Sequence, residues 1–387
     1  MNKGFLKYII LIICVMIGVS SCRKGYPVIV AETVEVYIPE YSSVDGFFLL
    51  NEGNMGTNKS TLDYYDYTTG EYTRNLYSTV NSSVTMDLGD VGNDLKVYGS
   101  RMYAVINCSN KVEVMDAKSA TRIGQVDIPN CRYIAFHEGY AYVTSYAGPV
   151  QVDSNYEQLG YVAKVDTLTL EVVAECIVGY QPDGLAIVND RIYVANSGGY
   201  MVPNYENTLT VIDIDSFTEV NQIVVAENLS NVCADKYGNL WVTSRGDYYD
   251  LPSQLFCVNT TTEMVTDTLD IATSSLWLDG DSLYICGSSW SYTDMTSTVT
   301  YGIVNVKDKA IVTNRFINDG TESNITLPYG IAVNPINKDI YVADARNYVT
   351  SGYLYCYDSD GILKWSVRTG EIPANIAFIG ELKNEEE

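Results

Sequence analysis

A short strand pattern recurs seven times along the chain and constrains the fold more than any other feature of the sequence. Each copy is mostly apolar and carries an aromatic residue at its first or second position. The spacing of the copies, roughly 39 to 57 residues, is the period of one four-stranded β-propeller blade. The copies lie at residues 47–50, 102–105, 141–144, 192–195, 240–243, 283–286 and 340–343.

The residues around each copy supply the other strands of a blade. A short apolar strand precedes the copy, as at 184–188, and a tight polar turn such as 189–190 joins the two as a hairpin. A third strand follows and ends near an Asp and a Thr, as at 211–213, and an outer strand comes next, as at 219–223. The order predicts four antiparallel strands per repeat.

The two ends of the repeat region complement each other. The first copy, at 47–50, has no strand before it, whereas residues 372–378 form a first strand with nothing after it. Pairing the two would complete the seventh blade and remove the open edges that unpaired strands present. We therefore expect an all-β fold, a seven-bladed β-propeller closed by its terminal strands. The alternative, a β-sandwich of short strands, does not explain why one end completes the other.

The N-terminus has the features of an export signal. Lys3 and Lys7 precede an apolar run at 8–19, which is short for a membrane span, and the run ends at Ser-Ser-Cys22, which resembles a bacterial lipobox. We expect lipidation of Cys22, and Arg23 after it favours the outer membrane over the inner one. An ordinary signal peptide or an anchor helix is the alternative. The expected divisions are a signal (1–21), a lipidated tether (22–44), the propeller (45–380) and an acidic tail (381–387).

Composition narrows the choice of partners. The net charge of −24 argues against nucleic acid or anionic lipid, because neither approaches a negative surface readily. The chain has 33 Tyr against 8 Phe, and tyrosine suits half-exposed contact surfaces because its ring is apolar and its hydroxyl is polar.

Seven cysteines remain after Cys14 in the signal and Cys22 are set aside. Cys108 and Cys131 lie at polar strand ends, and the sequence leaves both a disulfide and two free thiols open. The chain has no C-x-x-C pair, so a zinc ribbon, a thioredoxin-type site and covalent haem have no support, and we expect no cofactor. Three cysteines inside apolar strands should be buried: Cys257, Cys286 and Cys356.

Blade topology assigns the loops to two faces. Turns between first and second strands, and between third and fourth, open on one face and are minimal, as at 67–70, 166–169 and 358–361. We call this the short-turn face. Loops between second and third strands, and the links between blades, open on the other, loop-rich face. Its long loops are 51–60, 145–160, 196–207, 244–253, 288–298 and 344–352.

The loop-rich face is the predicted binding site. Long aromatic loops on one side of a rigid scaffold are typical of ligand binding, although some of these tyrosines are expected only to pack over the blades. The expected ligand-binding residues are Asn54, Asn107, Tyr146, Tyr156, Asn196, Tyr200, Tyr205, Arg245, Asp247, Tyr248, Tyr249, Trp290, Tyr292, Arg346 and Tyr348.

Histidine chemistry is disfavoured at this site. The only histidine, His137, falls in a turn of the short-turn face, so we expect neither a histidine-dependent mechanism nor a histidine-rich metal centre. The acidic, glycine-rich segment 87–94 does not match EF-hand spacing. A link between blades is favoured there over a calcium site, and no metal-binding residue is predicted.

Several segments together resemble a known family. They are 48–56 (FLLNEGNMG), 62–67 (LDYYDY), 105–110 (VINCSN) and 194–200 (VANSGGY). They resemble exported YncE-type propellers and, within these, BtuG-type surface lipoproteins, over about residues 47–378. The resemblance implies a cell-surface lipoprotein of the outer membrane that binds vitamin B12, a corrinoid, and passes it to a TonB-dependent transporter. It supplies no residue-by-residue ligand contacts.

Two other functions remain open. A propeller that binds a glycan or a protein partner would need much the same aromatic surface. A lyase or hydrolase would need two rim carboxylates, such as Asp247 and Asp344, at a matched separation. We expect a binding protein rather than an enzyme.

Overall fold

The computed structural model describes residues 33–35, 44–84, 87–293 and 295–380. The predicted signal (1–21), the lipidation site Cys22 and the acidic tail (381–387) lie outside the described residues. Within the predicted tether, Thr33–Glu35 form strand β1. No helix in the described ranges has both the length and the apolar character needed to span a membrane.

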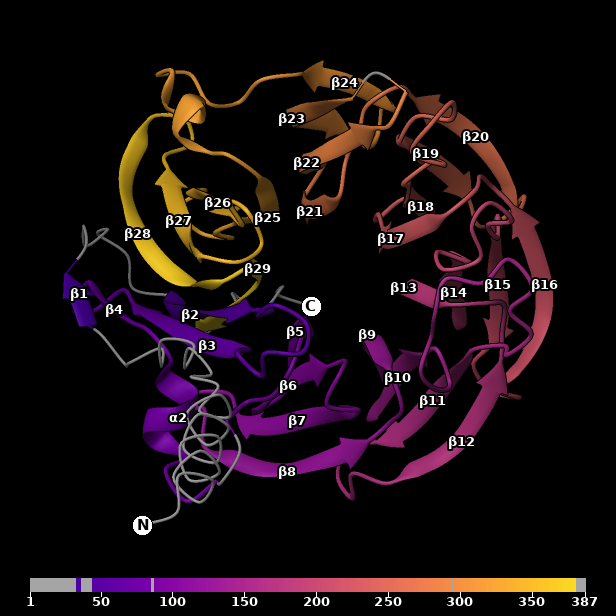
Figure 1. Cartoon of the computed structure of the whole chain (residues 1–387), viewed down its shortest axis with the longest axis horizontal. Helices are drawn as coiled ribbons and strands as arrows, with labels where there is room; N and C mark the ends of the chain where they lie inside the picture. The colour runs from indigo at the N-terminus through magenta and orange to yellow at the C-terminus, as the bar shows by residue number, and fades with distance from the viewer. Residues whose placement is uncertain (1–32, 36–43, 85–86, 294, 381–387) are drawn as a thin grey trace, which may run out of the picture. The chain divides into compact units, whose positions relative to one another are not determined.

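Seven antiparallel sheets follow one another around a ring, which confirms the predicted seven-bladed β-propeller (Figure 1). In six of them, four consecutive strands run from the centre outwards. The first three of these sheets contain β5 (Gly92–Tyr98), β6 (Arg101–Ile106), β7 (Lys111–Asp116) and β8 (Arg122–Asp127); β9 (Cys131–His137), β10 (Tyr140–Ser145), β11 (Tyr161–Asp166) and β12 (Val172–Ile177); and β13 (Pro182–Val188), β14 (Arg191–Asn196), β15 (Thr208–Asp213) and β16 (Thr218–Val224).

The next three sheets repeat this order. They contain β17 (Leu229–Ala234), β18 (Asn239–Ser244), β19 (Gln254–Asn259) and β20 (Met264–Leu269); β21 (Ser275–Asp279), β22 (Ser282–Ser291), β23 (Thr296–Asn305) and β24 (Ala310–Thr313); and β25 (Pro328–Val333), β26 (Ile340–Asp344), β27 (Ser351–Tyr357) and β28 (Leu363–Glu371).

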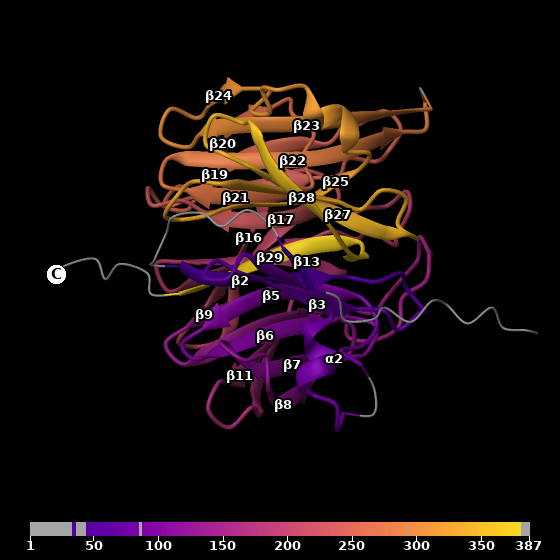
Figure 2. The ribbon, with the colours of Figure 1, turned by 90° about the vertical axis from the view of Figure 1, so that its left-hand side faces the viewer.

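The seventh sheet joins the two ends of the repeat region. Its order is β1-β4-β3-β2-β29, where β2 is Val44–Asn51, β3 is Thr61–Asp66, β4 is Glu71–Thr73 and β29 is Pro373–Gly380. Strand β29 pairs with β2 in antiparallel register, with Leu49 opposite Ile376. In Figures 1 and 2 the yellow β29 lies beside the indigo β2. The predicted closure is therefore confirmed.

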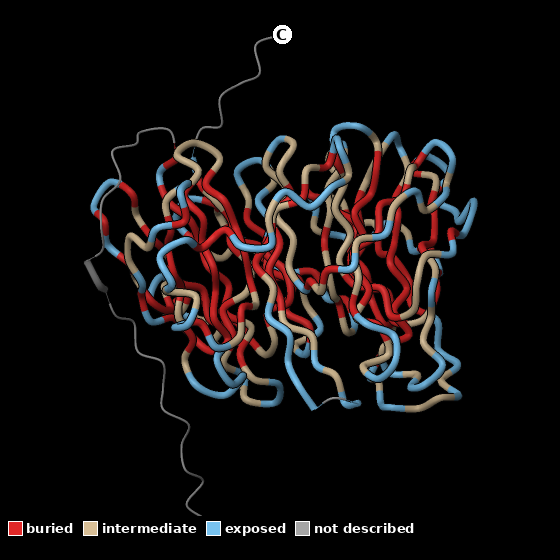
Figure 3. The backbone as a smooth tube through the Cα atoms, turned by 90° about the horizontal axis from the view of Figure 1, so that it is seen from above, coloured by how far each residue is buried: buried red, intermediate tan, exposed pale blue. Residues whose placement is uncertain are grey.

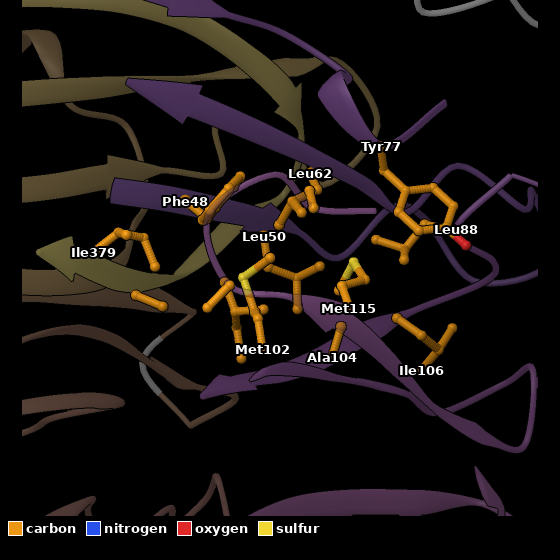
Figure 4. Packing of buried hydrophobic residues seen from close by; sticks show 14 residues of the cluster. Phe48, Leu50, Leu62, Tyr77, Leu88, Met102, Ala104, Ile106, Met115 and Ile379 are labelled. Carbon is orange, nitrogen blue, oxygen red and sulfur yellow. The ribbon is translucent and has the colours of Figure 1, made fainter. Parts of the chain in front are cut away.

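The core lies between neighbouring sheets. The second strand of each blade has a strand on either side and a sheet against each face, so β6 and β18 are almost wholly buried. Figure 4 shows one such layer, in which Phe48 and Leu50 of β2 pack with Met102 and Ala104 of β6. Burying each large apolar side chain contributes about 1.5–3 kcal/mol. The outermost strand β16 is mostly exposed, and Figure 3 shows exposure concentrated at the two ends of the strands.

The turn after each third strand is capped by the side-chain oxygen of an Asp or an Asn. Asp116 shows the geometry: its Oδ1 accepts hydrogen bonds from the amides of Lys118 (3.1 Å) and Ser119 (2.9 Å). These bonds lower the pKa of Asp116 because they favour the charged carboxylate. The capping residues of the seven blades are Asp66, Asp116, Asp166, Asp213, Asn259, Asn305 and Asp358.

The structure departs from the sequence expectations in two places. The predicted loop at 288–298 is largely strand, because β22 and β23 continue to Ser291 and from Thr296, with Trp290 opposite Ser297. Polar, β-branched residues there extend the hairpin beyond the sheet. Two blade links also contain short helices that the strand pattern did not indicate, α2 (Leu76–Val80) and the 3-10 helix η1 (Thr321–Asn324).

The structure bears on both expectations about the cysteines. Burial of Cys257, Cys286 and Cys356 is confirmed. The structure has Cys108 and Cys131 as free thiols, the first exposed and the second buried.

Candidate functional site

A pocket of about 800 Å³ lies at the centre of the ring. All seven innermost strands line it, namely β5, β9, β13, β17, β21, β25 and β29. The remaining lining residues come from loops and blade links of the loop-rich face and from the extended β22–β23 hairpin. None of the described lining residues belongs to a turn of the short-turn face. The pocket therefore belongs to the loop-rich face.

Three aromatic side chains from different blades line the pocket on this face. Tyr248 follows β18, Trp290 is near the end of β22, and Tyr348 follows β26. Trp290 is 39% and Tyr348 44% exposed, so their rings are accessible to a ligand. Tyr248 and Tyr348 both have left-handed backbones, with φ of 66° and 62°. This conformation costs a side-chain-bearing residue about 1–2 kcal/mol, and bulky residues in turns of the short-turn face, such as Leu170 and Phe217, adopt it too.

A buried carboxylate binds two arginines at the pocket wall. Asp183 of β13 accepts hydrogen bonds from Arg132 Nε on Oδ1 (2.9 Å) and from Arg245 Nη2 on Oδ2 (2.8 Å). The Tyr146 hydroxyl donates a third bond to Oδ1 (2.6 Å). Burial favours the neutral acid, but Arg132 and Arg245 outweigh it and lower the pKa of Asp183. Both arginines line the pocket, whereas Asp183 lies behind them and is not part of its lining.

The pKa of a second carboxylate, Glu52 in the pocket lining, is raised rather than lowered. The backbone of Glu52 is fixed on both sides, because its amide donates to the carbonyl of Ile372, just before β29 (2.8 Å), and its carbonyl accepts from the amide of Gly92 in β5 (2.9 Å). Burial raises the pKa of Glu52 to about 7, although the Tyr329 hydroxyl bond (3.0 Å) and the charge of Arg132 act against the rise. Glu52 therefore titrates near neutral pH inside the pocket.

Four of the predicted binding residues line the pocket: Arg245, Tyr248, Trp290 and Tyr348. Tyr249 and Tyr292 form an exposed stacked pair beside it, with ring centroids 5.3 Å apart. Trp290 meets Tyr292 edge-on at 6.1 Å, so this pair continues the aromatic surface outwards.

Several predicted residues hold the loops together instead. Asn107 donates to Cys131 O (2.9 Å), Asn196 donates to Thr210 Oγ1 (2.9 Å), and Tyr146 binds Asp183. Asp247 Oδ1 accepts three amides of its own loop, and Asp344 Oδ1 accepts the amides of Leu327 and Arg346. Neither carboxylate lines the pocket.

The other predicted residues lie outside the pocket lining. Asn54 donates to Tyr348 O (2.7 Å) and thereby fixes the loop that carries this ring. Tyr156 meets Tyr180 edge-on, and Tyr200 meets Tyr146 in the same way. Arg346 lies over the ring of Tyr353, and burial near Tyr248 raises the pKa of Tyr205.

Several other charged and aromatic residues of the pocket and its wall were not predicted from the sequence. Arg132, Tyr133, Asp183 and Tyr329 lie on inner strands rather than in long loops, and Glu52 directly follows β2 at the start of the loop 51–60. A signal was present, since Arg132 and Asp183 each interrupt an otherwise apolar inner strand. A charge at such a position requires a partner or a function.

The fold and the pocket define a seven-bladed β-propeller with a central pocket on its loop-rich face. The chain belongs to a family described as a domain of unknown function (DUF5074), whose model matches residues 45–379. Among curated proteins, none matches the sequence.

Solved structures share the fold at low sequence identity. A quinonprotein alcohol dehydrogenase-like protein of Bacteroides thetaiotaomicron is 13% identical with a TM-score of 0.59, over 88% of this chain and 79% of that one. Hydrazine synthase of Kuenenia stuttgartiensis is 17% identical with a TM-score of 0.53, over 70% and 77%. The WD40 domain of Neurospora crassa Pan2 is 10% identical with a TM-score of 0.50, over 75% and 80%. At these identities the likeness extends to the fold alone.

Proposed function

We propose that this protein binds a corrinoid on its loop-rich face and releases it unchanged. The observation that carries the proposal is the convergence of Tyr248, Trp290 and Tyr348, from three blades, on one central pocket. A corrinoid is broad, flat and amphipathic, with many amide arms. Aromatic rings suit its faces, and the hydroxyl and amide groups of the pocket suit its arms.

The resemblance to BtuG-type lipoproteins supports the same ligand. The lipobox that ends at Cys22 supports lipidation and attachment to the outer membrane. The resemblance implies the position at the cell surface and the transfer of the corrinoid to a TonB-dependent transporter. The net charge of −24 is consistent with a partner other than nucleic acid, and with membrane contact through the lipid alone.

Calorimetric titration of the purified chain with cyanocobalamin tests the proposal. We expect saturable one-to-one binding that Trp290→Ala weakens. The matched control is Tyr237→Ala, because Tyr237 is a 43%-exposed aromatic residue on the short-turn face. No binding at tens of micromolar would reject the corrinoid and direct the search to glycans and protein partners of the same face.

One observation favours a second function, acid–base catalysis. Glu52 lines the pocket with a pKa of about 7, which is the range that suits a general acid or base. Turnover of a bound ligand that disappears in Glu52→Gln, with binding retained, would favour an enzyme over a binding protein.

A further inference from the structure

Two arginines present their guanidinium groups to the central pocket, while the carboxylate that holds them is hidden. Arg132 and Arg245 line the pocket, and Asp183 between them is 0% exposed. The single negative charge of Asp183 can therefore neutralise only one of the two positive charges. Burying charge is costly, and an unequal cluster of this kind leaves a net positive charge at the wall.

Hydrogen-bond donors of these arginines remain available. A guanidinium has five N–H donors. Within the described part of the chain, Arg132 donates only through Nε, to Asp183. Arg245 donates from Nη2 to Asp183, and its Nη1 makes only long contacts of 3.4–3.5 Å with Leu229 O and Asn228 Oδ1. The two groups are thus fixed by one carboxylate and can still donate to a ligand.

The other charges of the pocket cancel this excess only in part. Lys96 and Asp94 both line it and form their own pair at 3.3 Å. Glu52 is the other lining carboxylate, and its pKa of about 7 leaves it partly neutral at neutral pH. A positive wall inside a chain of net charge −24 is the reverse of what the composition alone would produce.

We propose that the central pocket binds an oxyanion of its ligand, a carboxylate or a phosphodiester, between the guanidinium groups of Arg132 and Arg245. Charge-assisted bonds from guanidinium to an oxyanion are about twice as strong as neutral ones, and they specify planar geometry. The neighbouring groups indicate a ligand that also carries hydroxyl or amide groups. Those groups are Asn93, Asn231, Ser253, Ser274, Ser288 and Asn375.

Two sources share this chemistry. A sugar acid carries a carboxylate among hydroxyl groups, and its recognition would not depend on the function proposed above. The nucleotide arm of a cobalamin carries a phosphodiester, and in that case the inference rests on the proposed corrinoid binding.

The experiment compares each anionic probe with an analogue that lacks the anion. The full chain is titrated by calorimetry with galacturonate against galactose, and with cyanocobalamin against dicyanocobinamide, which has no phosphodiester. We expect the anionic member of at least one pair to bind at least about 10-fold more tightly. The pair that discriminates identifies the source.

Substitutions of the two arginines test whether they cause the preference for the anionic probe. Arg132→Gln and Arg245→Gln should each reduce the preference for the anion. The control Arg191→Gln removes the same charge at the short-turn face, where Arg191 pairs with Glu263. This variant should leave the preference for the anion unchanged. Because the wild-type comparison needs no mutation, a variant that fails to fold does not prevent the test.

The outcomes separate the two proposals. Equal affinity within both pairs, or no binding of either anionic probe at millimolar concentration, would overturn the oxyanion site. If neither pair shows a preference but cyanocobalamin and dicyanocobinamide both bind tightly, the oxyanion site is overturned while corrinoid binding is supported. A preference for galacturonate without corrinoid binding would support the oxyanion site and reject the corrinoid. A preference for the anionic probe that persists in both arginine variants would also overturn the oxyanion site.

Discussion

The two faces of the propeller use the same residue types for different purposes. On the short-turn face, an Asp or Asn after every third strand caps the turn with its side-chain oxygen, and this holds in all seven blades. On the loop-rich face, Asp183 and Glu52 each occur in one blade only and contact residues of other blades. The repeated feature supports the fold, and the unrepeated ones converge on the pocket.

The difference shows how to locate function in a repeat protein. A group required by every blade recurs in every blade, so its role is structural. A charged group that is present in one blade only, in or beside the central pocket, is not required by the repeat and therefore indicates the site. Four predictions test this contrast, from the largest expected effect to the smallest.

The same substitution should have very different effects on the two faces. Asp183→Asn leaves Arg132 and Arg245 without their counter-charge, so we expect the free energy of unfolding to fall by about 3–5 kcal/mol. Asp116→Asn should change it by less than about 0.5 kcal/mol, because Asn already caps the equivalent turns at Asn259 and Asn305. Urea unfolding at pH 7 measures both, and equal effects would contradict the contrast.

Glu52 should make stability depend on pH. Its pKa rises from 4.5 to about 7 on folding, so the folded state holds the proton more tightly. Stability should therefore fall as pH rises from about 4.5 to 7, by at most about 3 kcal/mol. Unfolding measured at several pH values should show this fall in the wild type relative to Glu52→Gln. A constant difference between the two proteins across this range would be inconsistent with a raised pKa.

Aromatic residues should matter for binding on one face only. Trp290→Ala or Tyr248→Ala should weaken cyanocobalamin binding by about 1–3 kcal/mol, since each removes a ring that lines the pocket. Tyr237→Ala on the short-turn face should leave affinity unchanged. Calorimetry with circular dichroism as a folding control measures this, and unchanged affinity in both pocket variants would move the site elsewhere.

Removing one turn cap should have a small, local effect. Asp116→Ala loses the two amide bonds from Lys118 and Ser119, and we expect a loss of about 1 kcal/mol in the free energy of unfolding. Ligand affinity should stay the same. A change in affinity would mean that the two faces are coupled.

The repeats made the fold predictable from the sequence. Each copy of the strand pattern has to be a second strand, because only a position between two strands and two sheets accounts for its apolar character. The closure by β2 and β29 follows from counting strands. The short-turn face was equally accessible, since its Asp and Asn caps recur at fixed positions.

The site was only partly predictable, for physical reasons. Loop length indicated the correct face for the pocket, but Tyr248 and Tyr348 line it through left-handed backbones, and nothing in the sequence shows that bulky residues adopt them. The pairing of Arg132 with Asp183 joins separate blades, so spacing along the chain does not reveal it. The strand extension around Trp290 was hidden by polar residues that resemble a loop.

A crystal structure of the chain grown with cyanocobalamin tests the central claim most directly, because cobalt gives an anomalous signal that locates the ligand without a model of it. The account predicts one cobalt peak over the central pocket on the loop-rich face, next to Tyr248, Trp290 and Tyr348. A peak at the short-turn face or on the outer strands would contradict it, and so would crystals grown with excess ligand that show no peak.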